Sequence, residues 1–163
     1  VLDKQNAPTN ATGFKSGLGF RYPAYDIVAH GSSTAVTLTA ADSGADIGVA
    51  AITHDIVITL PTGIRGMFFF CHLGTAVASG KTIKFAIANS VSAADEWIVF
   101  NNTPAAGNTT IAHGAGGHTL TIPATTAVGG FVKIRCLADG DISGNETWVA
   151  ECYTSVACTA ADS

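Results

Sequence analysis

Residues 54–73, HDIVITLPTGIRGMFFFCHL, constrain the fold of this chain more than any other segment. The first part is apolar and β-branched, and at a period of two it places large apolar residues on one face, which is typical of a β-strand. These residues are Ile56, Ile58 and Leu60. A Pro-Thr-Gly turn at 61–63 ends the strand, because proline lacks an N–H donor and glycine tolerates positive φ. The apolar run 67–71 predicts a second strand, buried on both faces, and we expect the two strands to form a central hairpin.

Short apolar or alternating segments recur along the rest of the chain, and Gly, Pro, Asp and Asn separate them. These further candidate strands cover residues 35–39, 46–52, 81–88, 97–100, 118–122, 131–137 and 147–153. No long amphipathic helix is evident, and no internal repeat is strong enough to assign. About eight strands at this spacing predict an all-β fold, an antiparallel β-sandwich or jelly roll.

The predicted core takes the inward-facing residues of these strands. It consists of Val36, Leu38, Ile56, Ile58, Leu60, Phe68, Phe70, Ile83, Phe85, Ile87, Trp97, Val99, Leu120, Ile122, Val132, Ile134 and Trp148. Trp97 and Trp148 each lie within an apolar strand, which favours core packing over a sugar-stacking platform.

Residues 1–33 differ from the rest because they show neither a helical nor a strand period. Single large apolar residues stand apart there among polar residues and glycine, so the segment cannot bury a core of its own. These residues are Phe14, Leu18, Phe20, Tyr22 and Tyr25. We expect an extended N-terminal arm whose aromatic side chains dock on a partner, with a lead-in packed on its own domain as the alternative. The sandwich is expected at residues 34–153, and residues 154–163 are expected to fray or to lie on a neighbour.

Charge is scarce in this sequence. Only 12% of the 163 residues are charged, against about 25% in an average globular domain, which favours a surface partly covered in an assembly. The formal net charge is −4 and the basic residues are scattered singly, so nucleic acid is not an expected partner. No stretch approaches the roughly 18 apolar residues of a membrane span, and the first residues lack a signal-peptide core. We therefore expect no membrane partner, and a chain made in the cytoplasm or already trimmed.

The four cysteines are widely spaced and contain no C-x-x-C pair. They are Cys71, Cys136, Cys152 and Cys158. Such cysteines are expected to be buried, reduced thiols that act as small hydrophobic side chains. A Cys152–Cys158 disulfide is the alternative, and the sequence leaves it open.

The histidines give no clear metal site. His113 and His118 are separated by four flexible residues, which cannot hold two ligands in a fixed geometry. His54 and His72 flank the predicted hairpin, where we expect a cross-strand pair or a buried, hydrogen-bonded histidine. No pair of carboxylates stands out, and no G-x-S-x-G motif is present. The sequence predicts no catalytic residue, no metal site and no cofactor, and it does not support an enzyme.

Several segments resemble, in this order, a small β-domain that recurs in virion proteins of tailed bacteriophages. They are LTAADSG at 38–44, IVITLP at 56–61, GMFFF at 66–70, GGFVKI at 129–134 and the closing Trp148-Val149. The similar layout extends from Thr37 to Val149. It occurs in head decoration proteins and in fibre or spike proteins alike, so it implies a virion structural protein without choosing between them.

The short chain, with one domain and no heptads or rod-like repeats, favours the decoration class. By resemblance, such a cement protein binds the outer capsid surface as a homotrimer. It bridges neighbouring major capsid proteins and stabilises the shell against the pressure of packaged DNA. Two other classes stay open: a receptor- or glycan-binding head with its ligand site on loops such as 101–117, and a hydrolase with a carboxylate pair.

Overall fold

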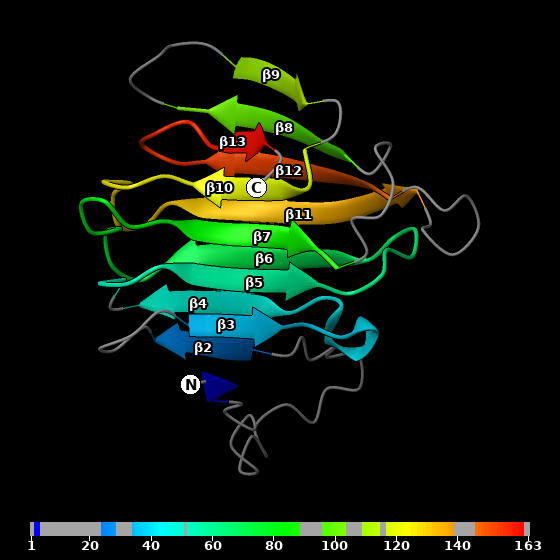
Figure 1. Ribbon diagram of the computed structural model, residues 1–163, viewed down its shortest axis with the longest axis horizontal. Helices are drawn as coiled ribbons and strands as arrows, with labels where there is room; N and C mark the ends of the chain where they lie inside the picture. The colour runs from blue at the N-terminus through cyan, green and yellow to red at the C-terminus, as the bar shows by residue number, and fades with distance from the viewer. Residues whose placement is uncertain are drawn as a thin grey trace, which may run out of the picture.

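The computed structural model describes residues 2–3, 24–28, 34–50, 52–88, 96–103, 109–114, 117–138 and 146–161. These residues form thirteen β-strands and one short 3-10 helix, η1 (Ala40–Asp42). Figure 1 shows the strands stacked across the molecule, from β1 at one end to β9 at the other. The predicted all-β sandwich is confirmed.

Eight strands form one sheet, here called sheet A. In spatial order they are β1 (Leu2–Asp3), β2 (Ala24–Val28), β4 (Asp46–Ala50), β6 (Phe68–Leu73), β11 (Phe131–Ala138), β12 (Thr147–Tyr153), β8 (Glu96–Asn102) and β9 (Thr109–Gly114). The other five form sheet B, in the order β13 (Thr159–Ala161), β10 (Thr119–Ile122), β7 (Ile83–Ile87), β5 (Ile56–Leu60) and β3 (Thr34–Thr37).

The chain from β2 to β7 alternates between the two sheets. β2, β4 and β6 are parallel neighbours in sheet A, and β3, β5 and β7 are parallel neighbours in sheet B. Ala24 pairs with Asp46 and Thr34 with Ile56, so the first two turns share an offset of 22 residues in both sheets. This segment is a three-turn coil with one strand of each turn in each sheet, a repeat that the sequence analysis did not recognise.

The coil corrects two predictions. The central hairpin is wrong, because β5 lies in sheet B and β6 lies in sheet A. The sheets are also mixed rather than purely antiparallel, since five of the eleven described strand pairings are parallel. A chain that changes sheet at every strand returns to the first sheet travelling in its original direction, and this produces the parallel pairs.

The second half of the chain extends both sheets. β11 pairs antiparallel with β6 and β12, and β10 pairs antiparallel with β7. β8 adds to β12 in parallel, and β9 pairs antiparallel with β8. β13, inside the predicted C-terminal tail, pairs with β10. Cys158, the residue before β13, is held by the side-chain amide of Asn101. This amide donates to the Cys158 carbonyl at 2.9 Å and accepts from the Cys158 N–H at 2.8 Å.

Two strands lie inside the range 1–33 that the sequence analysis assigns to an arm. β2 pairs with β4, and β1 pairs with β2. The sandwich therefore includes residues 24–28, and the predicted boundary at residue 33 is too late. Residues 4–23 and 29–33 lie outside the described part of the chain.

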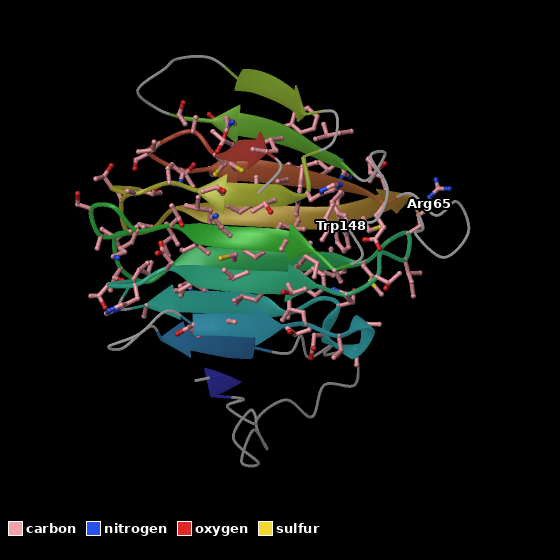
Figure 2. The ribbon with its side chains drawn as sticks, in the orientation of Figure 1. Arg65 and Trp148 are labelled. Carbon is pink, nitrogen blue, oxygen red and sulfur yellow. The ribbon has the colours of Figure 1, made fainter. Side chains whose placement is uncertain are left out.

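The core between the sheets contains the predicted inward-facing residues, with two exceptions. Trp97 and Trp148 are fully buried with ring centroids 6.2 Å apart, and Phe69 packs 6.2 Å from Trp148. The Trp148 indole N–H donates to the buried carboxylate of Glu146 at 2.9 Å. Figure 2 shows Trp148 inside the sandwich and Arg65 projecting from its edge, so core packing of Trp148 is confirmed.

The exceptions are Phe68 and Phe70, which point away from the core. On β6 the buried side chains are those of Phe69, Cys71 and Leu73, whereas Phe70 is 37% exposed. An unbroken apolar run has no period-two phase, so its sequence cannot tell the inner face from the outer face. The outward phenylalanines of β6 begin the surface described next.

Candidate binding face on sheet A

The outer side of sheet A carries a group of exposed and half-buried aromatic side chains, here called the aromatic face. Its aromatic residues come from β6, β8, β11 and β12 and are Phe68, Phe70, Phe100, Phe131 and Tyr153. Phe131, like Phe70, is 37% exposed. Clustered exposed apolar side chains of this kind mark surfaces that bind partners or ligands.

Strand register arranges these side chains in rows across the sheet. One row contains Asp46 on β4, Phe70 on β6, Lys133 on β11, Glu151 on β12 and Phe100 on β8. The neighbouring row contains His72, Phe131 and Tyr153. Because residues two apart on a strand share a face, the rows lie beside each other on the solvent side. Aromatic and charged groups are thus intermixed on this face.

Phe131 and Tyr153 form the centre of the aromatic face. Their rings are stacked, with centroids 4.5 Å apart and an interplanar angle of 14°. The ammonium nitrogen of Lys133 lies 5.9 Å from the Phe131 centroid and 5.5 Å from that of Tyr153, a cation–π arrangement. Adjacent strands are about 4.8 Å apart, so the two rings stand side by side across β11 and β12. The free side of Tyr153 therefore faces β8, and the free side of Phe131 faces β6.

A hollow lies on each side of this stacked pair. Hollow 1 has a volume of about 330 Å³ and is lined by Phe100, Asn102, Arg135, Glu151 and Tyr153. Hollow 2 has a volume of about 420 Å³, and its lining includes Asp46, Phe70, His72, Phe131 and Lys133. Each hollow thus combines two aromatic rings with a carboxylate and a cationic side chain.

Two pairs of oppositely charged side chains lie on the aromatic face. His72 Nδ1 lies 2.9 Å from Asp46 Oδ1, and Arg135 Nη2 lies 4.0 Å from Glu151 Oε1. All four side chains are substantially exposed, so these contacts are weak and can rearrange around a ligand. The face therefore offers donors and acceptors without a large excess of either charge.

A third hollow, of about 640 Å³, opens at one end of the face. Its lining contains Arg65, Phe68, Arg135 and Leu137. Arg65 precedes Gly66, whose φ of +93° shapes the turn between β5 and β6. Arg135 lines both this hollow and hollow 1, so these two hollows adjoin each other.

The structure does not bring the predicted histidines together. His54 contacts its neighbour Thr53, with Nδ1 3.0 Å from the hydroxyl oxygen, whereas His72 contacts Asp46 on the aromatic face. His72 is therefore paired across strands, as expected, but with Asp46 on β4 rather than with His54, and it is exposed rather than buried. The side chain of His113 lies outside the described residues, and His118 uses its carbonyl to accept from the Trp97 indole at 3.4 Å.

The predicted arm residues are largely untested. Phe14, Leu18, Phe20 and Tyr22 fall outside the described residues. The backbone of Tyr25 lies in β2, paired with Ile47. Their role in docking stays a prediction.

The cysteines are buried free thiols, as the first of the two interpretations predicts. Burial raises the pKa of Cys71. The thiol of Cys152 is hydrogen-bonded to Cys158, and this bond together with burial raises the pKa of Cys152. The same bond, and a contact with the Thr154 hydroxyl at 3.7 Å, lower the pKa of Cys158 against the effect of burial.

Within the described residues, no group of three or more His, Cys, Asp or Glu side chains is placed to hold a metal ion. The same residues contain no helix that is long and apolar enough to cross a membrane. Comparisons with models of known protein families, with curated proteins and with solved structures found no significant match to this chain.

Sequence reasoning missed the aromatic face because strand register assembles it from four strands that are distant in sequence. One local signal was present, since Phe131, Lys133 and Arg135 alternate with buried residues along β11. That alternation predicts an outward aromatic residue beside two cations. It does not predict Tyr153 or Phe100 as their neighbours.

Proposed function

We propose that this protein is a virion structural protein, a head decoration protein that binds the outer capsid surface as a homotrimer. In this role it bridges neighbouring major capsid proteins and stabilises the shell against the pressure of packaged DNA. The proposal draws on the order of segments that resembles tailed-phage virion proteins. It also draws on the body of the molecule, in which every turn of the coil ties the two sheets together.

The position of β1 and β2 is the observation that carries this proposal. These two strands pair with each other and form one edge of sheet A, and residues 4–23, the N-terminal segment, are the chain between them. This segment contains Phe14, Leu18, Phe20 and Tyr22, which are the side-chain types that anchor protein interfaces. A docking segment between two edge strands suits a protein that contacts a neighbouring capsid subunit.

Multivalency supplies the mechanism. A single segment of this size binds weakly, because ordering it on a partner costs conformational entropy. Three copies in one trimer hold their contacts together, and the trimer leaves only when all contacts are released at the same time. Slow release under load is what a bridging protein requires.

The first test compares three versions of the chain on capsids from which any decoration protein has been stripped. Residues 24–33 are kept in the truncated version, because removing β2 would expose β4. The full chain is expected to sediment with capsids, while a version that begins at residue 24 stays in the supernatant. A double variant, Phe14→Ser with Phe20→Ser, is expected to bind at least about tenfold more weakly.

The matched control is Phe70→Ser, which changes an exposed aromatic residue on sheet A and leaves the N-terminal segment intact. It is expected to bind capsids like the parent. Sedimentation equilibrium of the free protein is expected to give a mass close to three times the 16.5 kDa of one chain. Capsid binding by the truncated version would contradict the docking role of the N-terminal segment. A monomeric mass at all concentrations would contradict the trimer.

A further inference from the structure

We propose that hollows 1 and 2 on the aromatic face form a binding site for a short, neutral oligosaccharide. This inference goes beyond capsid attachment and does not depend on it, because the aromatic face and the proposed docking segment, residues 4–23, consist of different residues. It rests on the stacked pair Phe131–Tyr153 and on the polar groups around the two hollows.

The stacked pair provides an aromatic wall for each hollow. Because Phe131 covers one side of the Tyr153 ring, the other side is turned toward hollow 1 and β8. By the same geometry, the free side of the Phe131 ring is turned toward hollow 2 and β6. The C–H groups on one side of a pyranose ring carry slight positive charge, and they pack on the electron-rich face of an aromatic ring. Mutual stacking fixes both rings in advance, which lowers the entropy cost of binding.

The polar side chains of hollow 1 match the chemistry of sugar hydroxyls. A hydroxyl both donates and accepts hydrogen bonds, so a polyol needs donors and acceptors side by side. In hollow 1 the Arg135 guanidinium donates, the Glu151 carboxylate accepts, and the Asn102 amide does both. In hollow 2 the Lys133 ammonium donates and the Asp46 carboxylate accepts.

Charge balance selects a neutral ligand. Lys133 and Arg135 are matched by Asp46 and Glu151 on the same face, and the chain carries a formal net charge of −4. A nucleic acid or a polyanionic saccharide would need a surplus of cationic side chains, which these hollows do not provide. A neutral sugar needs only the hydrogen-bonding groups, and the carboxylates do not repel it.

The spacing of the hollows favours a linear ligand. The hollows lie on opposite sides of β11 and β12, so their centres are separated by two to three strand spacings, roughly 10–14 Å. Their volumes, about 330 and 420 Å³, fall at the lower end of the range for small-ligand sites. A chain with one sugar ring in each hollow would cross the stacked pair between them.

The test is a titration of the ¹⁵N-labelled full chain with defined sugars, followed by amide chemical shifts. The probes are maltotriose, cellotriose, mannotriose and galactotriose, with trigalacturonic acid as the charged comparison. We expect at least one neutral trisaccharide to shift the amides of Asn102, Arg135 and Glu151 saturably, with a Kd of about 1 mM or below. The charged trisaccharide is expected to bind more weakly than its neutral counterpart.

Variants separate ring stacking from general effects on the fold. Tyr153→Ala is expected to weaken binding at least about tenfold, while Tyr153→Phe, which keeps the ring, retains most of it. Asn102→Ala, which leaves the stacked pair intact, is expected to weaken binding several-fold. The matched control is Val57→Ala on β5 of sheet B, which is expected to leave the Kd unchanged.

Three results would overturn the inference. One is the absence of any saturable shift at about 10 mM of every neutral probe. Another is binding that Tyr153→Ala and Asn102→Ala leave unchanged. The third is a shift of the same amides with protein concentration alone, which would assign the face to contact between copies of this chain. Capsid sedimentation is measured separately, so failure here leaves the proposed attachment standing, and the reverse also holds.

Discussion

At the scale of single residues, the thiols of the core show how burial decides chemistry. Burial raises the pKa of Cys71, because a thiolate without solvent or a cation is unfavourable, and the hydrogen bond with Cys158 together with burial raises the pKa of Cys152. Thiolate is the reactive form, so these two cysteines are inert while the protein is folded. The hydrogen bond between Cys152 and Cys158 nevertheless brings their two sulfur atoms together, so we expect oxidation to form a disulfide at this pair first.

Counting alkylated cysteines shows whether Cys152 and Cys158 are free thiols or a disulfide. In the native protein at pH 8, an alkylating reagent is expected to modify none of the four cysteines over minutes, because all four are buried. After unfolding in guanidinium without reductant, mass spectrometry is expected to find four alkylated cysteines. Two alkylated cysteines, with Cys152 and Cys158 unmodified, would contradict the free thiols and establish the disulfide instead.

A second prediction at this scale concerns Asp55, which ties together the loops before β5 and β7. Its Oδ1 accepts from the backbone N–H of Thr82 at 2.9 Å and from the Thr82 hydroxyl at 3.1 Å. The backbone bond is the largest cause that lowers the pKa of Asp55 below 3.8. The carboxylate therefore stabilises the fold above pH 3.8, and this contribution is lost as the pH falls through the lowered pKa.

Asp55→Asn is expected to reduce stability at pH 7 by less than about 1 kcal/mol, because solvent screens this exposed group. The difference in unfolding free energy between parent and variant is expected to shrink as the pH falls below about 4. Urea unfolding at a series of pH values measures it. The control Thr82→Val, which removes only the hydroxyl donor, is expected to give part of the effect. A difference that grows toward low pH would contradict the assigned sign.

At the scale of elements, the coil depends on repeated turns between the sheets. Gly44 and Gly66 are 22 residues apart, and both have positive φ, +88° and +93°. They occupy corresponding places in successive turns, after Thr37-Leu38 in the first turn and after Thr59-Leu60 in the second. The Gly66 N–H donates to the Cys136 carbonyl at 3.1 Å, so this turn also holds β11 beside β6.

Gly66→Ala is expected to lower the unfolding free energy by about 1–2 kcal/mol, because an L residue with a Cβ is strained at this φ. No atom lies within 4 Å of the position a Cβ would take, so the cost is conformational rather than steric. Thermal or urea unfolding measures it. Gly66→Asn, which tolerates positive φ better, is expected to recover part of the loss. A Gly66→Ala variant as stable as the parent would show that this turn does not require glycine.

Period-two alternation in the sequence predicted most of the strands, though not β1, β2, β9 or β13, and the residues that it placed in the core are buried with two exceptions, because a half-buried strand must alternate. It failed at Phe68 and Phe70, where every residue of the run is apolar and the phase is lost. The alternation also could not predict strand direction. Whether two successive strands form a hairpin or lie in different sheets depends on how residues 61–67 cross between the layers. The 22-residue repeat was hidden because few side chains recur, chiefly the Thr-Leu pairs and the glycines of the turns.

At the scale of the whole molecule, the two proposals concern different residues. β1 and β2, the strands that flank the segment proposed to dock on the capsid, form one edge of sheet A, and the aromatic face lies on the outer side of that sheet. Sequence reasoning could suggest the first from the composition of residues 1–33. The second depends on the register of β6, β11, β12 and β8, which only the folded chain reveals.

The proposed strengthening of the capsid by the full chain can be measured by heating DNA-filled capsids with and without the protein and following DNA release with an intercalating dye. We expect a higher release temperature once the protein saturates the capsid surface, because bridged subunits must separate before the shell opens. An unchanged release temperature at full occupancy, or no occupancy at all, would contradict it.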